Sequence, residues 1–174
     1  MRKRFDRIDV SVMVAKCDRT ARRMTHAHLG KMLGVDRAKL ESVIRRLKRC
    51  RFYTDDIEQD RKSVSTYLFL NARRDVPAIC GTFRVRGVPT GYGAPIAARE
   101  FSVVGSRPPV WPCPLRACRT ITRIGYSIDP LCPNSISFPD SMPRLYDLFA
   151  LVDMFRLGRA RERAFAKRAF EDLP

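Results

Sequence analysis

Residues 25–50 read THAHLGKMLGVDRAKLESVIRRLKRC, and two short apolar periodicities lie on either side of Gly34 in this stretch. Thr25 is suited to cap a first helix, and Gly34 can supply the left-handed residue that ends it. Asp36 can then cap a second helix. The apolar positions of that second helix follow at spacings of three and four: Leu40, Val43 or Ile44, and Leu47. The stretch therefore predicts two short helices joined by a tight turn.

The flanking residues complete a familiar order of elements. Upstream, RIDVSVMVA (residues 7–15) favours a helix, although its alternation also fits a strand. Downstream, residues 52–54 and 63–70 have the composition of two strands around a polar tip. Helix, helix, turn, helix and hairpin is the order of a winged helix-turn-helix.

The segment LGKMLGVDRAKLESVIRRLKRCRF (residues 29–52) resembles the MarR-type and ArsR-type winged-helix regulators. The apolar and turn positions of their pattern are occupied here by Leu29, Leu33, Gly34, Val35, Leu40, Ile44, Leu47 and Phe52. The resemblance covers residues 5–72, and it implies a winged-helix fold that binds DNA. Two residues depart from the pattern. Gly30 stands where alanine is common, and Arg51 stands where a glycine usually lets the chain leave the recognition helix.

The second helix carries the predicted DNA contacts. Its exposed side chains include one acid, Glu41, against seven lysines and arginines between residues 37 and 51, whereas a helix that needs only solubility usually mixes its charges. The side chains expected at base edges or flanking phosphates are Arg37, Lys39, Ser42 and Arg45. Those expected on the DNA backbone are Arg46, Arg49 and the wing pair Arg61 and Lys62. Double-stranded RNA or a protein partner are the alternatives.

The composition of the whole chain also indicates a polyanionic partner. Thirty-four lysines and arginines against 18 acids give a net charge of +16 over 174 residues. No signal peptide and no apolar run of membrane-spanning length is recognisable, so a cytoplasmic protein without membrane contact is expected, nucleoid-associated if the source is bacterial. Six cysteines are then expected to be reduced thiols.

The distribution of proline and glycine divides the chain into three segments. Residues 71–143 hold eleven of the twelve prolines and six of the nine glycines. We therefore expect an α+β protein with a winged helix-turn-helix at 1–72, an irregular β-containing or partner-ordered segment at 73–140, and a long amphipathic helix at 141–174. Three runs in the middle segment alternate like strands: TFRVRGV, REFSVVG and TITRIGYSI.

The expected C-terminal helix has an apolar stripe that requires a partner surface. Leu145, Leu148, Val152 and Phe155 follow a spacing of three and four residues. The stripe either docks on its own chain or pairs with a second subunit, and a homodimer would present two recognition helices to a palindromic site.

Metal binding and catalysis are less well supported. Cys80, Cys113, Cys118 and Cys132 lie in one irregular segment and could bind zinc, but the paired Cys-x2-Cys spacing is absent. No phosphate-binding glycine loop, nucleophile elbow or other catalytic motif is recognisable, so no enzyme and no cofactor is expected. The sequence favours a sequence-specific duplex DNA-binding protein, most simply a transcriptional regulator. The alternatives are a replication or mobile-element accessory factor that binds origin DNA, and an inhibitor that uses a winged helix to bind another protein.

Overall fold

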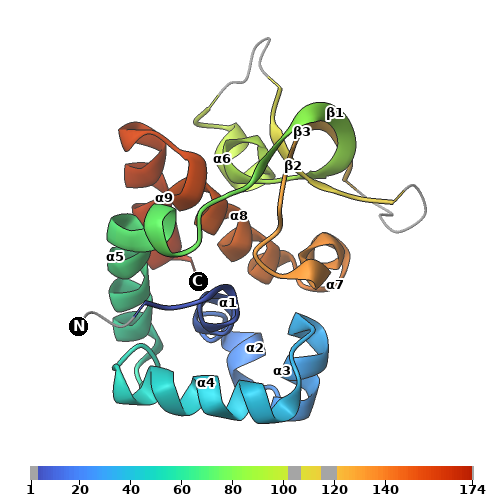
Figure 1. Cartoon of the computed structure of the whole chain (residues 1–174). Coiled ribbons are helices and arrows are strands. Elements are labelled where there is room, and N and C mark those ends of the chain that lie inside the picture. Colours follow the sequence, from blue (N-terminus) through green and yellow to red (C-terminus); the bar gives the residue numbers. More distant parts are fainter. Residues whose placement is uncertain (1–3, 102–106, 115–120, 174) are drawn as a thin grey trace.

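The computed structural model describes residues 4–101, 107–114 and 121–173 (Figure 1). It is an α+β structure in which helices from both ends of the chain pack together and a small sheet of three strands lies at one end of the molecule. The N-terminal helices are α1 (Arg7–Ala15), α2 (Arg19–Arg23), α3 (His26–Leu33), α4 (Arg37–Arg49) and α5 (Ile57–Asp75). In Figure 1, α3 and α4 lie at the end of the molecule opposite the sheet.

Local capping explains the first four helices. Residues 7–15 form a helix because Asp6 and Asp9 make a reciprocal capping box at its start. Thr25 caps α3 by accepting a hydrogen bond from the His28 amide, and Gly34 ends α3 with a φ of 69°. The two predicted helices of residues 25–50 are thus confirmed.

The turn between α3 and α4 is tight enough to require glycine at position 30. A Cβ at Gly30 would lie 2.6 Å from the Val35 carbonyl oxygen. The Val35 amide also donates to the Gly30 carbonyl at 2.8 Å, which closes the turn. Alanine, the better helix former, therefore cannot be accommodated here without a shift of the backbone.

The prediction of a wing hairpin is wrong, because residues 57–75 form the long helix α5. Asp56 caps this helix through hydrogen bonds from the Glu58 and Gln59 amides. Val64, Leu68 and Ala72 recur every fourth residue and are all buried. Val64 and Leu68, which alternate like strand residues, also lie one turn apart on a helix, with Thr66 exposed between them. Packing of α5 against α8 and α9 selects the helix.

The middle segment forms a three-stranded sheet in which each strand pairs with the other two. Strand β1 (Cys80–Pro89) is antiparallel to β2 (Pro109–Pro112) and β3 (Arg123–Ile128), while β2 and β3 are parallel. Such close packing requires glycine at position 125, where a Cβ would lie 2.0 Å from the Pro108 carbonyl oxygen. Two of the three predicted strand-like runs lie in β1 and β3, and most of the third, residues 102–105, lies outside the described residues.

Short helical turns connect the sheet to the helices. These are η1 (Gly91–Gly93), α6 (Pro95–Ala98), η2 (Pro133–Ser137) and α7 (Phe138–Ser141). Just before and within η2, two side chains reach the end of α3. The Asn134 amide donates to the Met32 carbonyl at 3.1 Å, and the Cys132 thiol donates to the Leu33 carbonyl at 3.2 Å. The middle segment therefore satisfies carbonyl groups that α3 leaves without helical partners.

The predicted C-terminal helix is two helices, α8 (Pro143–Leu157) and α9 (Ala160–Asp172), with a break at Gly158. A Cβ at Gly158 would lie 2.5 Å from the Met154 carbonyl oxygen. Helix α8 is buried along almost its whole length, and the predicted stripe Leu145, Leu148, Val152 and Phe155 is covered by the chain itself. Of the two expected roles of this stripe, docking on its own chain is the one that the structure shows.

A buried polar network joins α8 to the sheet. The Asp153 carboxylate accepts hydrogen bonds from the Thr90 hydroxyl and Trp111 Nε1, both at 2.7 Å. Its other oxygen accepts from Arg156 at 2.6 Å. Arg156 also donates to the carbonyls of Val76, Pro77 and Asp129. Burial raises the pKa of Asp153, and the Arg156 guanidinium opposes that shift.

Candidate nucleic-acid interface

One face of α4 is fully open to solvent. Ala38, Ser42, Arg45 and Arg49 are all exposed, and their spacing of four, three and four residues places them in a single stripe. The opposite face buries Leu40, Val43, Ile44 and Leu47 against the core. Because α4 lies at an end of the molecule, this stripe, which we call the α4 stripe, faces away from the body of the protein (Figure 1).

The arginines of the α4 stripe lie beyond ion-pair distance of every acid in the described residues, although the charge of Arg45 helps to lower the pKa of Glu41. Neither Arg45 nor Arg49 forms an ion pair with any residue in the described part of the chain. Together with Ser42 and Lys48 they line a shallow hollow of about 450 Å³ on the surface of α4. The hollow is open and positively charged, which suits a phosphate group or the edge of a base.

Two predicted contacts at the start of α4 lie beside acids on the protein surface. Arg37 donates to Glu41 at 2.8 Å, and this hydrogen bond lowers the pKa of Glu41 and raises that of Arg37. Lys39 Nζ lies 3.7 Å from Asp6. Such exposed ion pairs are weak and exchange readily with solvent or a ligand. Arg37 and Lys39 therefore stay accessible, with part of their charge compensated.

Two other predicted contacts are structural instead. Arg46 forms an ion pair with the buried carboxylate of Asp9, which ties α4 to the capping box of α1. Arg61 is buried in α5, where it donates to the carbonyls of Cys17, at 2.9 Å, and Leu173, and burial lowers its pKa. Neither side chain can contact DNA without loss of these bonds. Lys62 is exposed, but it stands on α5 and not on a wing.

A cluster of cations around one aromatic ring was not predicted. Lys16, Arg22 and Lys48 place their charged groups 5.4, 4.7 and 5.3 Å from the centre of the Tyr53 ring. Arg22 is paired with Asp60 at 2.8 Å, whereas the Lys16 side chain is buried and donates to the Arg22 carbonyl. Burial and the neighbouring cations Arg22 and Lys48 lower the pKa of Lys16 to about 8. Residues from four parts of the chain meet here, so no local motif indicates the cluster.

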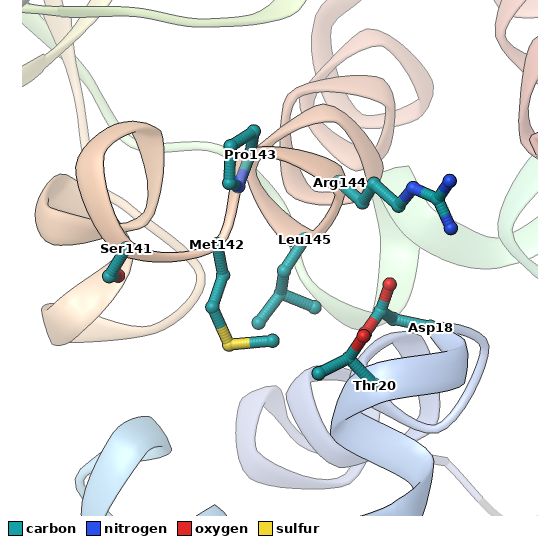
Figure 2. A pocket seen from close by; sticks show the side chains of 7 residues that line it. All are labelled: Asp18, Thr20, Ser141, Met142, Pro143, Arg144 and Leu145. Atoms are coloured by element: carbon teal, nitrogen blue, oxygen red, sulfur yellow. The ribbon is translucent and has the colours of Figure 1, made fainter.

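A second hollow, of about 370 Å³, lies where α2 meets the start of α8 (Figure 2). Met142 and Leu145 extend into it from above, while Asp18 and Thr20 face them from the other side. The remaining lining residues are Ser141, Pro143 and Arg144. Asp18 also serves as the cap of α2 by accepting from the Ala21 amide. The apolar part of its wall comes from Met142, Pro143 and Leu145, and the hollow lies between the N-terminal helices and α8.

The expected zinc ligands are not grouped in the described structure. Among residues 4–101, 107–114 and 121–173, no group of three or more His, Cys, Asp or Glu side chains could hold a metal ion. Cys132 is buried against α3, Cys80 is exposed at the start of β1, and Cys118 lies outside the described residues. In the parts of the chain that were searched, no helix combines the length and apolar character needed to cross a membrane.

Comparison with family models, with curated proteins and with solved structures gave no match to this chain.

Proposed function

We propose that this chain is a sequence-specific double-stranded DNA-binding protein that acts as a transcriptional regulator by occupying its site through α4. The observation that carries the proposal is the α4 stripe, in which Arg45 and Arg49 project from an exposed helix without acidic partners. A protein gains no stability from two such unpaired arginines on one face. Their position on the helix that follows a helix-turn connection therefore favours a ligand with regularly spaced negative charges.

The dimensions of α4 suit the major groove of B-form DNA. Its 13 residues span about 20 Å, at 1.5 Å per residue, and the groove is about 12 Å wide. Ser42 and Arg45, in the middle of the stripe, are placed to reach base edges, and a bidentate arginine to guanine is the commonest specific contact. Arg37, Lys39 and Arg49 lie nearer the ends and margins of the helix, where phosphates flank the groove.

The remaining surface of this end of the molecule adds positive charge. Lys31 of α3 and Arg19 and Arg23 of α2 are exposed, and the exposed His26 and His28 of α3 add hydrogen-bonding groups. Lys48 is exposed on the side of α4 that faces Tyr53. With the wing absent, phosphate contacts flanking α4 are assigned to these side chains in place of Arg61 and Lys62.

Selection from a random duplex library at two salt concentrations tests this proposal. The wild-type chain should enrich one sequence, and Arg45→Ala/Arg49→Ala should lose that enrichment. Arg159→Ala/Arg168→Ala is a matched control, because it removes the same charge from exposed positions on α9, away from α4 in Figure 1. Retained duplex binding without enrichment by any of the three proteins, falling steeply with salt, would remove the claim of sequence specificity.

A further inference from the structure

The segment between α5 and the end of β3 is almost free of acids. Residues 76–128 contain seven arginines, no lysine and a single acid, Glu100. The described part of this segment includes the whole antiparallel pairing of β1 with β3. This ribbon lies at the end of the molecule opposite α4, with the helices of the core between them (Figure 1). It therefore forms a second basic surface, and binding of DNA by α4 gives no reason for it.

The register of the two strands gathers arginines and an apolar side chain on one face. Arg84 is paired with Tyr126, and Arg86 with Ile124, so these four residues alternate onto the same face of the ribbon. Arg84, Arg86 and Ile124 are exposed, the last by 52%. In the described structure none of Arg84, Arg86 and Arg123 forms an ion pair, although Arg86 donates to the Thr122 hydroxyl.

An aromatic ring projects from the same strand. Phe83, next to Arg84, is 81% exposed, although a ring of this size is usually buried. Residues 81–84 of β1 are all exposed, so the ribbon is open on both faces at this point. Ile79 and Ile121 add exposed apolar surface on either side. A ligand that makes only apolar contacts would not need the arginines, and a ligand that is only charged would not need the exposed apolar side chains.

We infer that the ribbon of β1 and β3 binds single-stranded nucleic acid. Phe83 and Arg123 alternate onto the opposite face from Arg84, Arg86 and Ile124, and both faces are open at this end of the ribbon. A flexible unpaired strand that bends around this open end offers phosphates to the arginines and the flat faces of its bases to Phe83 and Ile124. A duplex buries those faces inside its stack and offers only its phosphates, sugars and base edges. The combination of arginines with an exposed ring thus favours the single strand over the duplex. The lack of acids suits any polyanion, and the exposed Phe83 and Ile124 select a polyanion that also offers flat apolar faces.

Two binding surfaces at opposite ends let one molecule hold two nucleic-acid ligands at once. With a duplex on α4 and an unpaired strand on the ribbon, one chain holds double-stranded DNA and a separated strand at opposite ends of its core. That arrangement suits a protein acting where a duplex is opened, such as an origin or a DNA end. The ribbon surface stands independently of the α4 stripe, so either can fail experimentally without the other.

Fluorescence anisotropy with a labelled single-stranded oligonucleotide of about 15 nucleotides tests the inference. Phe83→Ala should weaken binding about tenfold, Phe83→Leu should weaken it nearly as much, and Phe83→Trp should retain it, because stacking needs a ring. Arg84→Ala/Arg86→Ala should weaken it and reduce its salt dependence. Because all three side chains are exposed, these variants should keep the wild-type fold and melting temperature.

Controls separate this surface from α4 and from charge in general. Arg45→Ala/Arg49→Ala should leave single-strand binding unchanged while weakening binding to a duplex. Full retention of single-strand affinity by Phe83→Ala and Arg84→Ala/Arg86→Ala would overturn the inference. So would full affinity of Phe83→Leu, or competition by polyglutamate as strong as that of the unlabelled strand, because either result would mean that bases are not recognised.

Discussion

Arg51 shows how a single residue departs from the pattern that its position requires. It follows the end of α4 with a φ of 58°, the only non-glycine residue with positive φ in the described structure. The Phe52 amide donates to the Leu47 carbonyl at 3.0 Å and closes the helix end in a way that usually places glycine at position 51. The resemblance to the winged-helix pattern marks Arg51 as a departure, and the structure shows that the chain keeps the left-handed turn despite the side chain.

Replacing Arg51 with glycine should therefore stabilise the protein. A side chain in the left-handed region costs roughly 1 kcal/mol, which Arg51→Gly should recover in the free energy of unfolding. Arg51→Ala is the control, since it removes the charge and keeps the strain. Chemical denaturation of the three proteins measures the effect, and an equal gain for alanine and glycine would assign it to the charge instead.

Lys16 is a single residue that makes the stability of the protein depend on pH. Its pKa falls from 10.5 to about 8 on folding, so between these values the unfolded chain binds more protons than the folded one. Stability contributed by this group therefore rises with pH from about 8 to 10.5, and the penalty of burying the charge is fully present below pH 8.

Comparing the wild type with Lys16→Met isolates the contribution of the Lys16 charge to stability. At pH 7 the variant avoids burying a charge, and the stability of the wild type relative to it should increase as the pH is raised from 8 to 10.5. Denaturant titrations at several pH values measure that difference. A difference that stays constant across the range would show that Lys16 is not perturbed.

At the scale of elements, sequence and structure agree where local chemistry decides. Thr25, Gly34 and Asp36 fix the limits of α3 and α4 through contacts within three or four residues, so their spacing predicts both helices. The limits of α5 depend on more distant packing. Its buried face meets α8 and α9, the first of which begins 68 residues after α5 ends, and the alternation of residues 63–70 therefore indicated a strand wrongly.

The predicted DNA contacts also divide into those that local chemistry determines and those that contacts with distant residues determine. The exposed positions Ser42, Arg45 and Arg49 follow from the helical period of α4. The structural roles of Arg46 and Arg61 do not, because their partners are Asp9 and the carbonyls of Cys17 and Leu173. A basic residue is equally basic in the sequence whether it faces solvent or a buried carboxylate.

The network at Asp153 should be essential to the attachment of α8 to the sheet. Asp153→Asn leaves the buried Arg156 with reduced compensation and should lower the free energy of unfolding by about 3 kcal/mol. Asp172→Asn, an exposed acid at the end of α9, should change it by less than about 0.5 kcal/mol. Trp111, the only tryptophan, donates to Asp153, so its fluorescence reports the transition directly. Equal stabilities of the two variants would refute the role of the network.

At the scale of the whole molecule, the three segments of the sequence share one core. The buried apolar side chains form a continuous cluster that includes Val12 of α1, Leu47 of α4, Trp111 of β2 and Phe155 of α8. The shift in proline and glycine content marks a change of local structure and not a boundary between separate cores. Composition alone cannot distinguish these cases, because it carries no information on which surfaces meet.

A shared core predicts a single cooperative unfolding transition. Trp111 fluorescence follows the sheet, and far-UV circular dichroism follows the helices, most of which lie outside the middle segment. The two signals should change at the same denaturant concentration. Loss of the fluorescence signal while most of the helical signal remains would show that the helices fold independently of the sheet.

The central claim, that α4 is the surface that binds duplex DNA, is tested most directly by affinity as a function of salt. Binding of one duplex should be measured for the wild type, Arg45→Ala/Arg49→Ala and Arg159→Ala/Arg168→Ala. We expect the α4 variant to bind at least about tenfold more weakly, with a salt slope reduced by about 1 for each lost phosphate contact, and the α9 variant to bind like the wild type. Equal losses in both variants would contradict the claim and leave duplex binding as a property of the total charge.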